Sequence, residues 1–119
     1  MHSRSHAQSS TGALTVIETV VEPGSGPPLH RHPSLDESFY VLQGRLTFRV
    51  GEALFTALQG AAVFAARGTA HAYSNQSAEA VRVVVVCTPG EPEADGRARP
   101  THYSEIVGPS LEAELSALR

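Results

Sequence analysis

Lysine is absent from this sequence of 119 residues, and cysteine occurs only once. Without lysine, a mechanism based on a lysine Schiff base or on a desolvated lysine base is excluded. Cys87 lies inside an apolar run, so a single chain can build neither a disulfide framework nor a thiolate zinc cluster. This use of cysteine fits a reducing compartment, and we expect a cytoplasmic protein.

Clustered positive charge and long apolar segments are missing as well. All nine cationic residues are arginines scattered along the chain, and the formal net charge is -3. This balance provides no basic stripe for nucleic acid or for an anionic membrane surface. The first ten residues are polar and lack the apolar core of a secretion signal, and no run is long enough to span a membrane. We expect residues 1–12 to form a disordered tail, with neither nucleic acid nor membrane as a partner.

The pattern of residues 13–88 is that of short strands separated by turns, within a chain of one-domain length. Apolar residues at 46, 48 and 50 mark the core face of one strand. Gly51, Gly60 and Gly68 predict tight turns. The run 81–87 is almost entirely apolar and rich in valine, which predicts a central strand covered on both faces. Strands are expected over 16–21, 39–42, 46–50 and 81–87.

The segment 89–119 has a different pattern. Residues 89–100 are rich in proline, glycine and charge, which predicts an exposed loop. Pro109 and Ser110 resemble a helix start, and Leu111, Leu115 and Leu118 follow at helical spacing. We expect a short C-terminal helix that packs on the strands.

One histidine pair and one glutamate form a candidate binding site. His30 and His32 are two positions apart, so on an extended backbone their rings leave the same face, with Cα atoms about 6.5 to 7 Å apart. Glu37 shares its parity with Phe39 and Val41, which places a carboxylate on an apolar face, where it needs a partner. Taken singly, each has an ordinary interpretation: a surface histidine for His30 or His32, and a strand-edge charge for Glu37.

Two spaced motifs include these residues. The first has Gly, five residues, His-x-His, four residues, Glu, six residues and Gly; its positions are held by Gly24, His30, His32, Glu37 and Gly44. The second has Gly, five residues, Pro-x-Gly, two residues, His, three residues and Asn; its positions are held by Gly60, Ala66, Gly68, His71 and Asn75. Through these motifs the sequence resembles the cupin superfamily. Ala66 replaces the proline, which makes the turn less rigid but removes no ligand.

The resemblance implies a single-domain cupin-type double-stranded β-helix, a jelly-roll barrel, over residues 13–88. It also implies that His30, His32, Glu37 and His71 hold one divalent transition metal inside the barrel. The resemblance places the histidine pair and Glu37 on one sheet and His71 on the facing hairpin. Imidazole and carboxylate ligands suit Fe, Mn, Ni, Co or Zn, and an octahedral ion would keep two positions open for substrate or water.

The residues around this site have two interpretations each. Phe39, Val41 and Phe48 either line an apolar substrate pocket or belong to the ordinary core. Tyr73 has the parity of His71, so its hydroxyl can face the cavity, although a strand tyrosine is more often half-buried packing. Glu37 and Tyr73 are the candidate catalytic residues. Arg31 and Arg49 are expected to be solvated, and His102 has no evident partner.

Three functions remain open from the sequence. The first is a metal-dependent enzyme on a small, mostly apolar, oxygen-bearing metabolite, similar to dioxygenase-like cupins such as the quercetin dioxygenases. The second uses the metal only as a Lewis acid, for isomerase, lyase or cyclase chemistry of secondary metabolism. The third is a non-catalytic module that binds a metal or a ligand, because a fold does not determine a function. We also expect a homodimer, because an exposed strand edge and an apolar outer sheet need cover.

Overall fold

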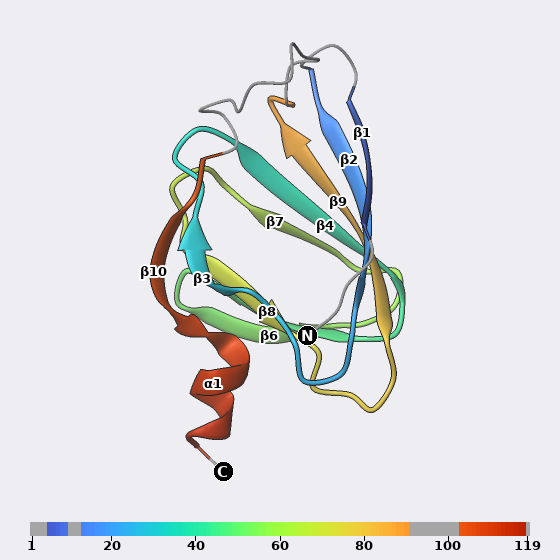
Figure 1. The fold of residues 1–119 in the computed structure, drawn as a ribbon, viewed down its shortest axis with the longest axis vertical. Coiled ribbons are helices and arrows are strands. Elements are labelled where there is room, and N and C mark those ends of the chain that lie inside the picture. Colours follow the sequence, from blue (N-terminus) through green and yellow to red (C-terminus); the bar gives the residue numbers. More distant parts are fainter. Residues whose placement is uncertain (1–4, 10–12, 91–102, 119) are drawn as a thin grey trace.

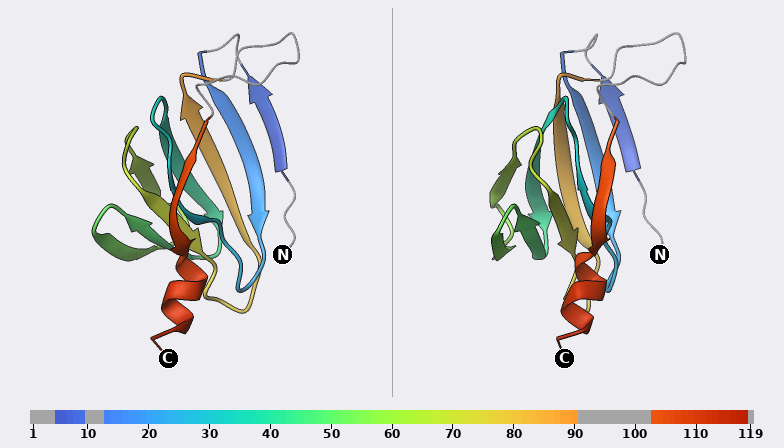
Figure 2. Two further views of the ribbon diagram at one scale, coloured as in Figure 1. Left: turned by 60° about the vertical axis from the view of Figure 1, so that its left-hand side comes forward. Right: turned by 90° about the vertical axis from the view of Figure 1, so that its left-hand side faces the viewer.

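Two antiparallel sheets of five strands each face one another (Figures 1 and 2). The computed structural model describes residues 5–9, 13–90 and 103–118. Sheet A has the order β1 (Ser5–Ser9), β2 (Thr15–Val21), β9 (Val81–Thr88), β4 (Asp36–Gln43) and β7 (Ala62–Ala65). Sheet B has the order β10 (Glu105–Ser110), β3 (Pro28–Arg31), β8 (His71–Ser74), β5 (Leu46–Val50) and β6 (Ala53–Ala57), and helix α1 (Leu111–Ser116) follows β10. The all-β architecture with a short C-terminal helix is as predicted.

The core lies between the inner faces of the two sheets. Strand alternation turns Phe39 and Val41 of β4 inward, as predicted, and both are almost completely buried. Leu46 and Phe48 of β5 meet them from sheet B, so the predicted core face of that strand is confirmed. The rings of Phe39 and Phe48 pack edge to face with centroids 5.2 Å apart, which joins the sheets directly below the candidate site.

The valine-rich strand β9 is central in sheet A, between β2 and β4. Its inward residues Val81 and Val83 are fully buried, in agreement with the predicted central position. Its outer face is covered only in part: Val84 is half-buried and Arg82 is exposed. The prediction of a strand covered on both faces therefore holds for the inner face only, because no other layer lies over sheet A among the described residues.

The C-terminal segment contains both the predicted helix and a strand that the sequence pattern did not indicate. Ser110 caps α1, with its hydroxyl accepting a hydrogen bond from the backbone N–H of Ala113 at 3.1 Å. Of the predicted apolar stripe, Leu111 is buried, whereas Leu118 is exposed. Preceding the helix, β10 pairs antiparallel with β3 and runs along the edge of sheet B into α1 (Figure 2).

Two further expectations differ from the structure, one about the N-terminal tail and one about Arg49. Within the tail expected over residues 1–12, Ser5–Ser9 forms β1, which pairs with β2 at the edge of sheet A. Arg49, expected to be solvated, instead donates to Glu114 of α1 at 2.9 Å and ties the helix to sheet B.

His102 and most of the loop expected over 89–100 lie outside the described residues. Within the ranges that are described, no helix is long and apolar enough to cross a membrane.

Candidate metal centre

The four candidate ligands come from both sheets and meet between them. His30 lies in β3, His32 directly follows β3, and His71 begins β8. His30 and His71 are cross-strand partners, so all three imidazoles belong to the sheet B side. Glu37 lies in β4 of sheet A and faces them. The resemblance had implied a different division, with His71 facing the other three ligands. The register corrects it, because β3 pairs with β8 and not with β4.

The donor atoms are close enough to share one ion. One ligand atom from each of the four residues lies within 4.8 Å of all the others. Oε1 of Glu37 is 2.7 Å from Nε2 of His71 and 3.4 Å from Nε2 of His32. Two donors bound about 2.1 Å from one metal are at most about 4.2 Å apart, so coordination needs only a small inward movement.

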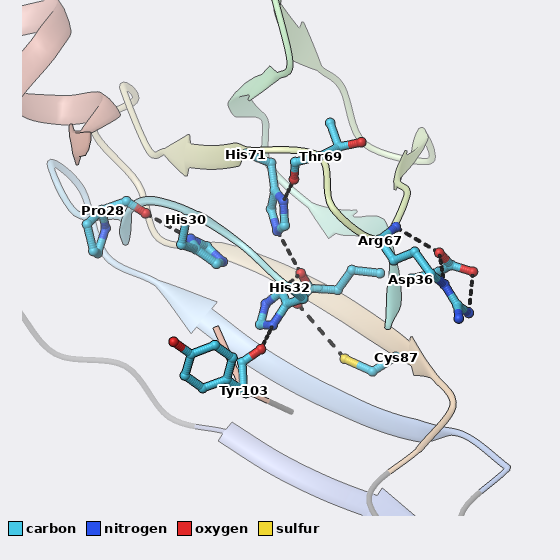
Figure 3. Close-up of polar contacts among 10 residues, drawn as sticks. Pro28, His30, His32, Asp36, Arg67, Thr69, His71, Cys87 and Tyr103 are labelled. Carbon is cyan, nitrogen blue, oxygen red and sulfur yellow. Dashed lines mark hydrogen bonds and ion pairs between the residues drawn. The ribbon is translucent and has the colours of Figure 1, made fainter. Parts of the chain in front are cut away.

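Backbone carbonyls fix the orientation of all three imidazole rings (Figure 3). A carbonyl oxygen can only accept, so each Nδ1 that contacts one carries the proton, and Nε2 is left with a free lone pair. Such outer contacts orient metal-bound histidines. The pairs are His30 with Pro28 at 2.8 Å, His71 with Thr69 at 2.9 Å, and His32 with Tyr103 at 3.3 Å.

The hydrogen-bond acceptors that face one another at the centre require a positive charge between them. With Nδ1 protonated, the neutral rings of His32 and His71 direct lone pairs at Oε1 of Glu37, which is itself an acceptor. Three lone pairs facing one another repel, unless extra protons convert the rings to imidazolium or a metal ion lies among them. The arrangement therefore fits a divalent metal, on the chemistry and orientation of its donors.

In the absence of metal, this cluster is an ion-pair network. Burial alone would raise the pKa of Glu37, but hydrogen bonds from His32 and His71 outweigh burial and lower the pKa to about 2. The same contact raises the pKa of His32. Burial is the main reason why the pKa of His30 is lowered. Glu37 is thus an anion, and His30 stays neutral and free to bind a metal more readily than His32 does.

A hollow of about 240 Å³ adjoins the centre, and its walls are about equally polar and apolar. Phe39 and Tyr73 lie on its wall, in agreement with the pocket interpretation of each. Val41 and Phe48, also expected there, are not wall residues but are buried in the core underneath. The lining is completed by Ile17, Thr19, Pro27, His30, Glu37 and Val85.

The sequence analysis missed the wall that β2 and β9 contribute. Ile17 and Val85 are cross-strand partners, so they occupy the same face of sheet A. Their inward parity was readable from the alternation of each strand. What the sequence did not show is that β2 and β9 run beside the ligand strand β4, which is a matter of strand order.

Comparison with known proteins identifies the family. The sequence model of the cupin domain matches residues 17–87, which is more than half of the chain. The chain is a cupin. No protein of curated function matches this cupin in sequence.

Solved structures share the fold. TT1209 from Thermus thermophilus is 27% identical, with a TM-score of 0.69 over 75% of this cupin and 85% of that chain. KdgF from Halomonas sp. is 19% identical, with a TM-score of 0.69 over 75% and 80%. Oxalate decarboxylase from Bacillus subtilis is 20% identical, with a TM-score of 0.66 over 77% of this chain and 26% of that one. The last two similarities concern the fold alone.

Tyr73 offers this cupin a hydrogen-bond donor beside the centre. Burial, and secondly the charge of Glu37, raise the pKa of Tyr73 to about 12. The phenol is therefore protonated at neutral pH. Its ring packs against those of Phe39 and Phe48, with centroids 5.9 Å away in both cases. A ring held in this way presents its hydroxyl in a fixed direction.

Two more residues support the site without binding a metal. Cys87, which the sequence marked only as part of an apolar strand, lies on β9 with Sγ 3.9 Å from Oε2 of Glu37. Burial, and secondly the charge of Glu37, raise the pKa of its thiol to about 12, so it is a donor to that carboxylate. Asn75 is fully buried and donates to the carbonyls of Val21 and Glu79, which holds the chain that leaves β8.

Proposed function

We propose that this cupin is a metal-dependent enzyme that acts on a small, mostly apolar metabolite bearing an oxygen donor, with dioxygenase-like chemistry. The observation that carries the proposal is the convergence of three oriented imidazoles and one carboxylate beside a hollow that His30 and Glu37 line and that also has apolar walls. A closed structural site would have no hollow beside its ligands.

His30, His32, Glu37 and His71 would hold the metal, which would supply a binding position for a substrate oxygen and, if redox-active, the activation of O₂. The protein's own groups have separate tasks. The ionised Glu37 either stays on the metal as a ligand or leaves it to shuttle a proton that the substrate releases on binding, for example from an enol. Tyr73 can donate a hydrogen bond to a second substrate oxygen.

The hollow limits the substrate class. Its volume of about 240 Å³ is below the roughly 300–1,000 Å³ of sites for drug-sized ligands, which favours a small metabolite. Ile17, Phe39 and Val85 offer apolar contacts on the wall of the hollow. The polar residues of the lining are His30, Glu37, Tyr73 and Thr19, which suits a substrate that carries oxygen atoms as well as apolar carbon.

The test begins with the metal. Protein purified without added metal or chelator is analysed for Fe, Mn, Ni, Co and Zn, together with His71→Ala. We expect a stoichiometric metal in the parent and its loss in the variant, because His71 shares the centre with Glu37. Arg82→Ala is the control, since Arg82 pairs with Glu18 on the outer face of sheet A. Equal metal content in parent and His71→Ala would refute the centre.

The second step separates the functions. Metal-reconstituted protein is incubated with small flavonols and β-diketones with and without air, and O₂ uptake and substrate loss are measured. Oxygen-dependent loss with matching O₂ uptake supports the dioxygenase proposal. Anaerobic conversion would replace it with Lewis-acid isomerase, lyase or cyclase chemistry. Tight binding without product would replace it with a non-catalytic binding module.

A further inference from the structure

The turn from β7 to β8 connects the two sheets at the metal centre. It spans residues 66–69, between Ala65 at the end of β7 in sheet A and the chain that enters β8 in sheet B. The N–H of Thr69 donates to the carbonyl of Ala66 at 3.0 Å, and Gly68 has φ +81°. A left-handed residue at this position and the closing hydrogen bond are features of a type II turn. No proline stiffens it, because Ala66 stands where the family motif has one.

An aspartate fastens this turn to the strand that carries Glu37 (Figure 3). Oδ1 of Asp36 accepts from the backbone N–H of Arg67 at 2.8 Å. The Arg67 guanidinium adds two bonds of 3.2 Å, from Nε to Oδ1 and from its terminal nitrogen to Oδ2. Such a two-pronged contact defines direction as well as distance. Asp36 directly precedes Glu37, so the turn is bound next to the carboxylate ligand.

The same turn contacts the chain at two histidine ligands. The N–H of Gly68 donates to the carbonyl of His32 at 2.8 Å. The carbonyl of Thr69 accepts from Nδ1 of His71 at 2.9 Å, and thereby fixes which ring nitrogen faces the centre. A shift of this turn would therefore move His71 relative to Glu37, whose contact with Nε2 of His71 is the shortest in the centre at 2.7 Å.

We propose that Asp36 and Arg67 are positioning residues, which hold the β7–β8 turn so that His71 meets Glu37 at metal-binding distance. This role rests on the metal centre proposed above. Neither side chain belongs to the cluster of donor atoms, so the pair acts through the turn. It supplies by hydrogen bonding the stiffness that a turn lacking proline does not have from its covalent structure.

The variants Arg67→Ala, Asp36→Ala and the double variant separate the two kinds of contact. Arg67→Ala removes the guanidinium bonds and keeps the backbone bond to Asp36, whereas Asp36→Ala removes all three. Arg82→Ala is the matched control, because it deletes an arginine of similar exposure from an ion pair on the outer face of sheet A. Arg67 is 53% exposed, so its truncation tests the proposal even if Asp36→Ala does not fold.

The experiment titrates metal-free protein with Co²⁺, whose visible spectrum reports the ligand geometry, and measures Co²⁺ release to a chelator. We expect Asp36→Ala to weaken binding by on the order of tenfold, as other losses of outer support for metal ligands do. Arg67→Ala should weaken it less and alter the spectrum. The double variant should bind Co²⁺ as weakly as Asp36→Ala does, because both residues act through one contact. Arg82→Ala should bind Co²⁺ as the parent does.

The outcomes separate this proposal from the one on which it rests. If the parent does not bind Co²⁺, the metal centre itself is refuted. If the parent binds and both single variants keep its affinity, release rate and spectrum, the positioning role is overturned and the centre stands. Urea unfolding of the metal-free variants identifies a merely structural role, in which stability falls while Co²⁺ affinity does not change; that result would also overturn the proposal.

Discussion

Replacing Glu37 with glutamine changes one charge at the middle of the centre and preserves its shape. Hydrogen bonds from His32 and His71 lower the pKa of Glu37 from its ordinary value of 4.5 to about 2, against the opposing effect of burial. At about 1.4 kcal/mol per pKa unit this corresponds to about 3 kcal/mol in favour of the ionised carboxylate. We therefore expect Glu37→Gln to lower the free energy of unfolding of the metal-free protein by about that amount at a pH where His32 is cationic.

The effect of Glu37→Gln on the free energy of unfolding depends on pH. A lowered carboxyl pKa adds stability above pH 4.5, and this stability is lost as the pH falls through about 2. A raised histidine pKa, as at His32, adds stability below pH 6.5, and this stability is lost as the pH rises through the folded value. Both contributions are present together between about pH 4.5 and 6.5. At higher pH the neutral Nε2 of His32 faces the carboxylate, and a glutamine amide can donate to it.

The assay is urea unfolding with a chelator present, at about pH 5.5 and about pH 8.5. Glu37→Gln should be strongly destabilised at the lower pH and little affected, or stabilised, at the higher one. Glu114→Gln is the control, because it removes a carboxylate that pairs with an arginine, Arg49, and not with a histidine. A destabilisation by Glu37→Gln that is equal at both pH values would refute the assigned protonation of Glu37 and its histidine partners. Saturating Zn²⁺ at the higher pH should stabilise the parent more than the variant.

Three further outcomes are expected. Metal affinity should fall as the pH drops below about 6, because imidazoles must be neutral to bind; full occupancy at about pH 4, measured by dialysis and elemental analysis, would contradict this. Tyr73→Phe should slow turnover roughly tenfold through one lost hydrogen bond and leave Co²⁺ affinity unchanged; unchanged turnover would remove Tyr73 from the reaction. Light scattering should give a homodimer, consistent with the exposed Tyr40 and Phe64 on the outer face of sheet A, whereas a monomer would refute that expectation.

The strands were predictable because their pattern is local. Alternate residues of a strand face opposite sides, so the parity shared by Glu37, Phe39 and Val41 indicated their inward direction correctly. Ser110 as the start of a helix was likewise readable from its neighbours. β10 was not predictable in this way, because its sequence, which contains Gly108 and Pro109, forms a strand only by pairing with β3.

The resemblance of two motifs to those of cupins implied that His30, His32, Glu37 and His71 share a metal, and the structure places their donor atoms together. The wall of the hollow was predicted only in part. Val41 has the right parity for a wall residue, as Phe39 does, yet it lies in the core. Parity gives the face of a strand, whereas the position of each residue along the gap between the sheets depends on how both sheets are paired and packed.

The sequence by itself determined which side chains share a face and where the turns lie, and through its resemblance to the cupin motifs it indicated four candidate metal ligands. Only the tertiary structure decided that the three histidines lie on the sheet B side and Glu37 in sheet A, and that the carbonyl of Tyr103, 71 positions away, contacts the His32 ring. The reason is that side-chain direction follows from the covalent geometry of a few neighbouring residues. Strand pairing instead brings together segments that are far apart in the chain, and its energy depends on partners that no local pattern identifies.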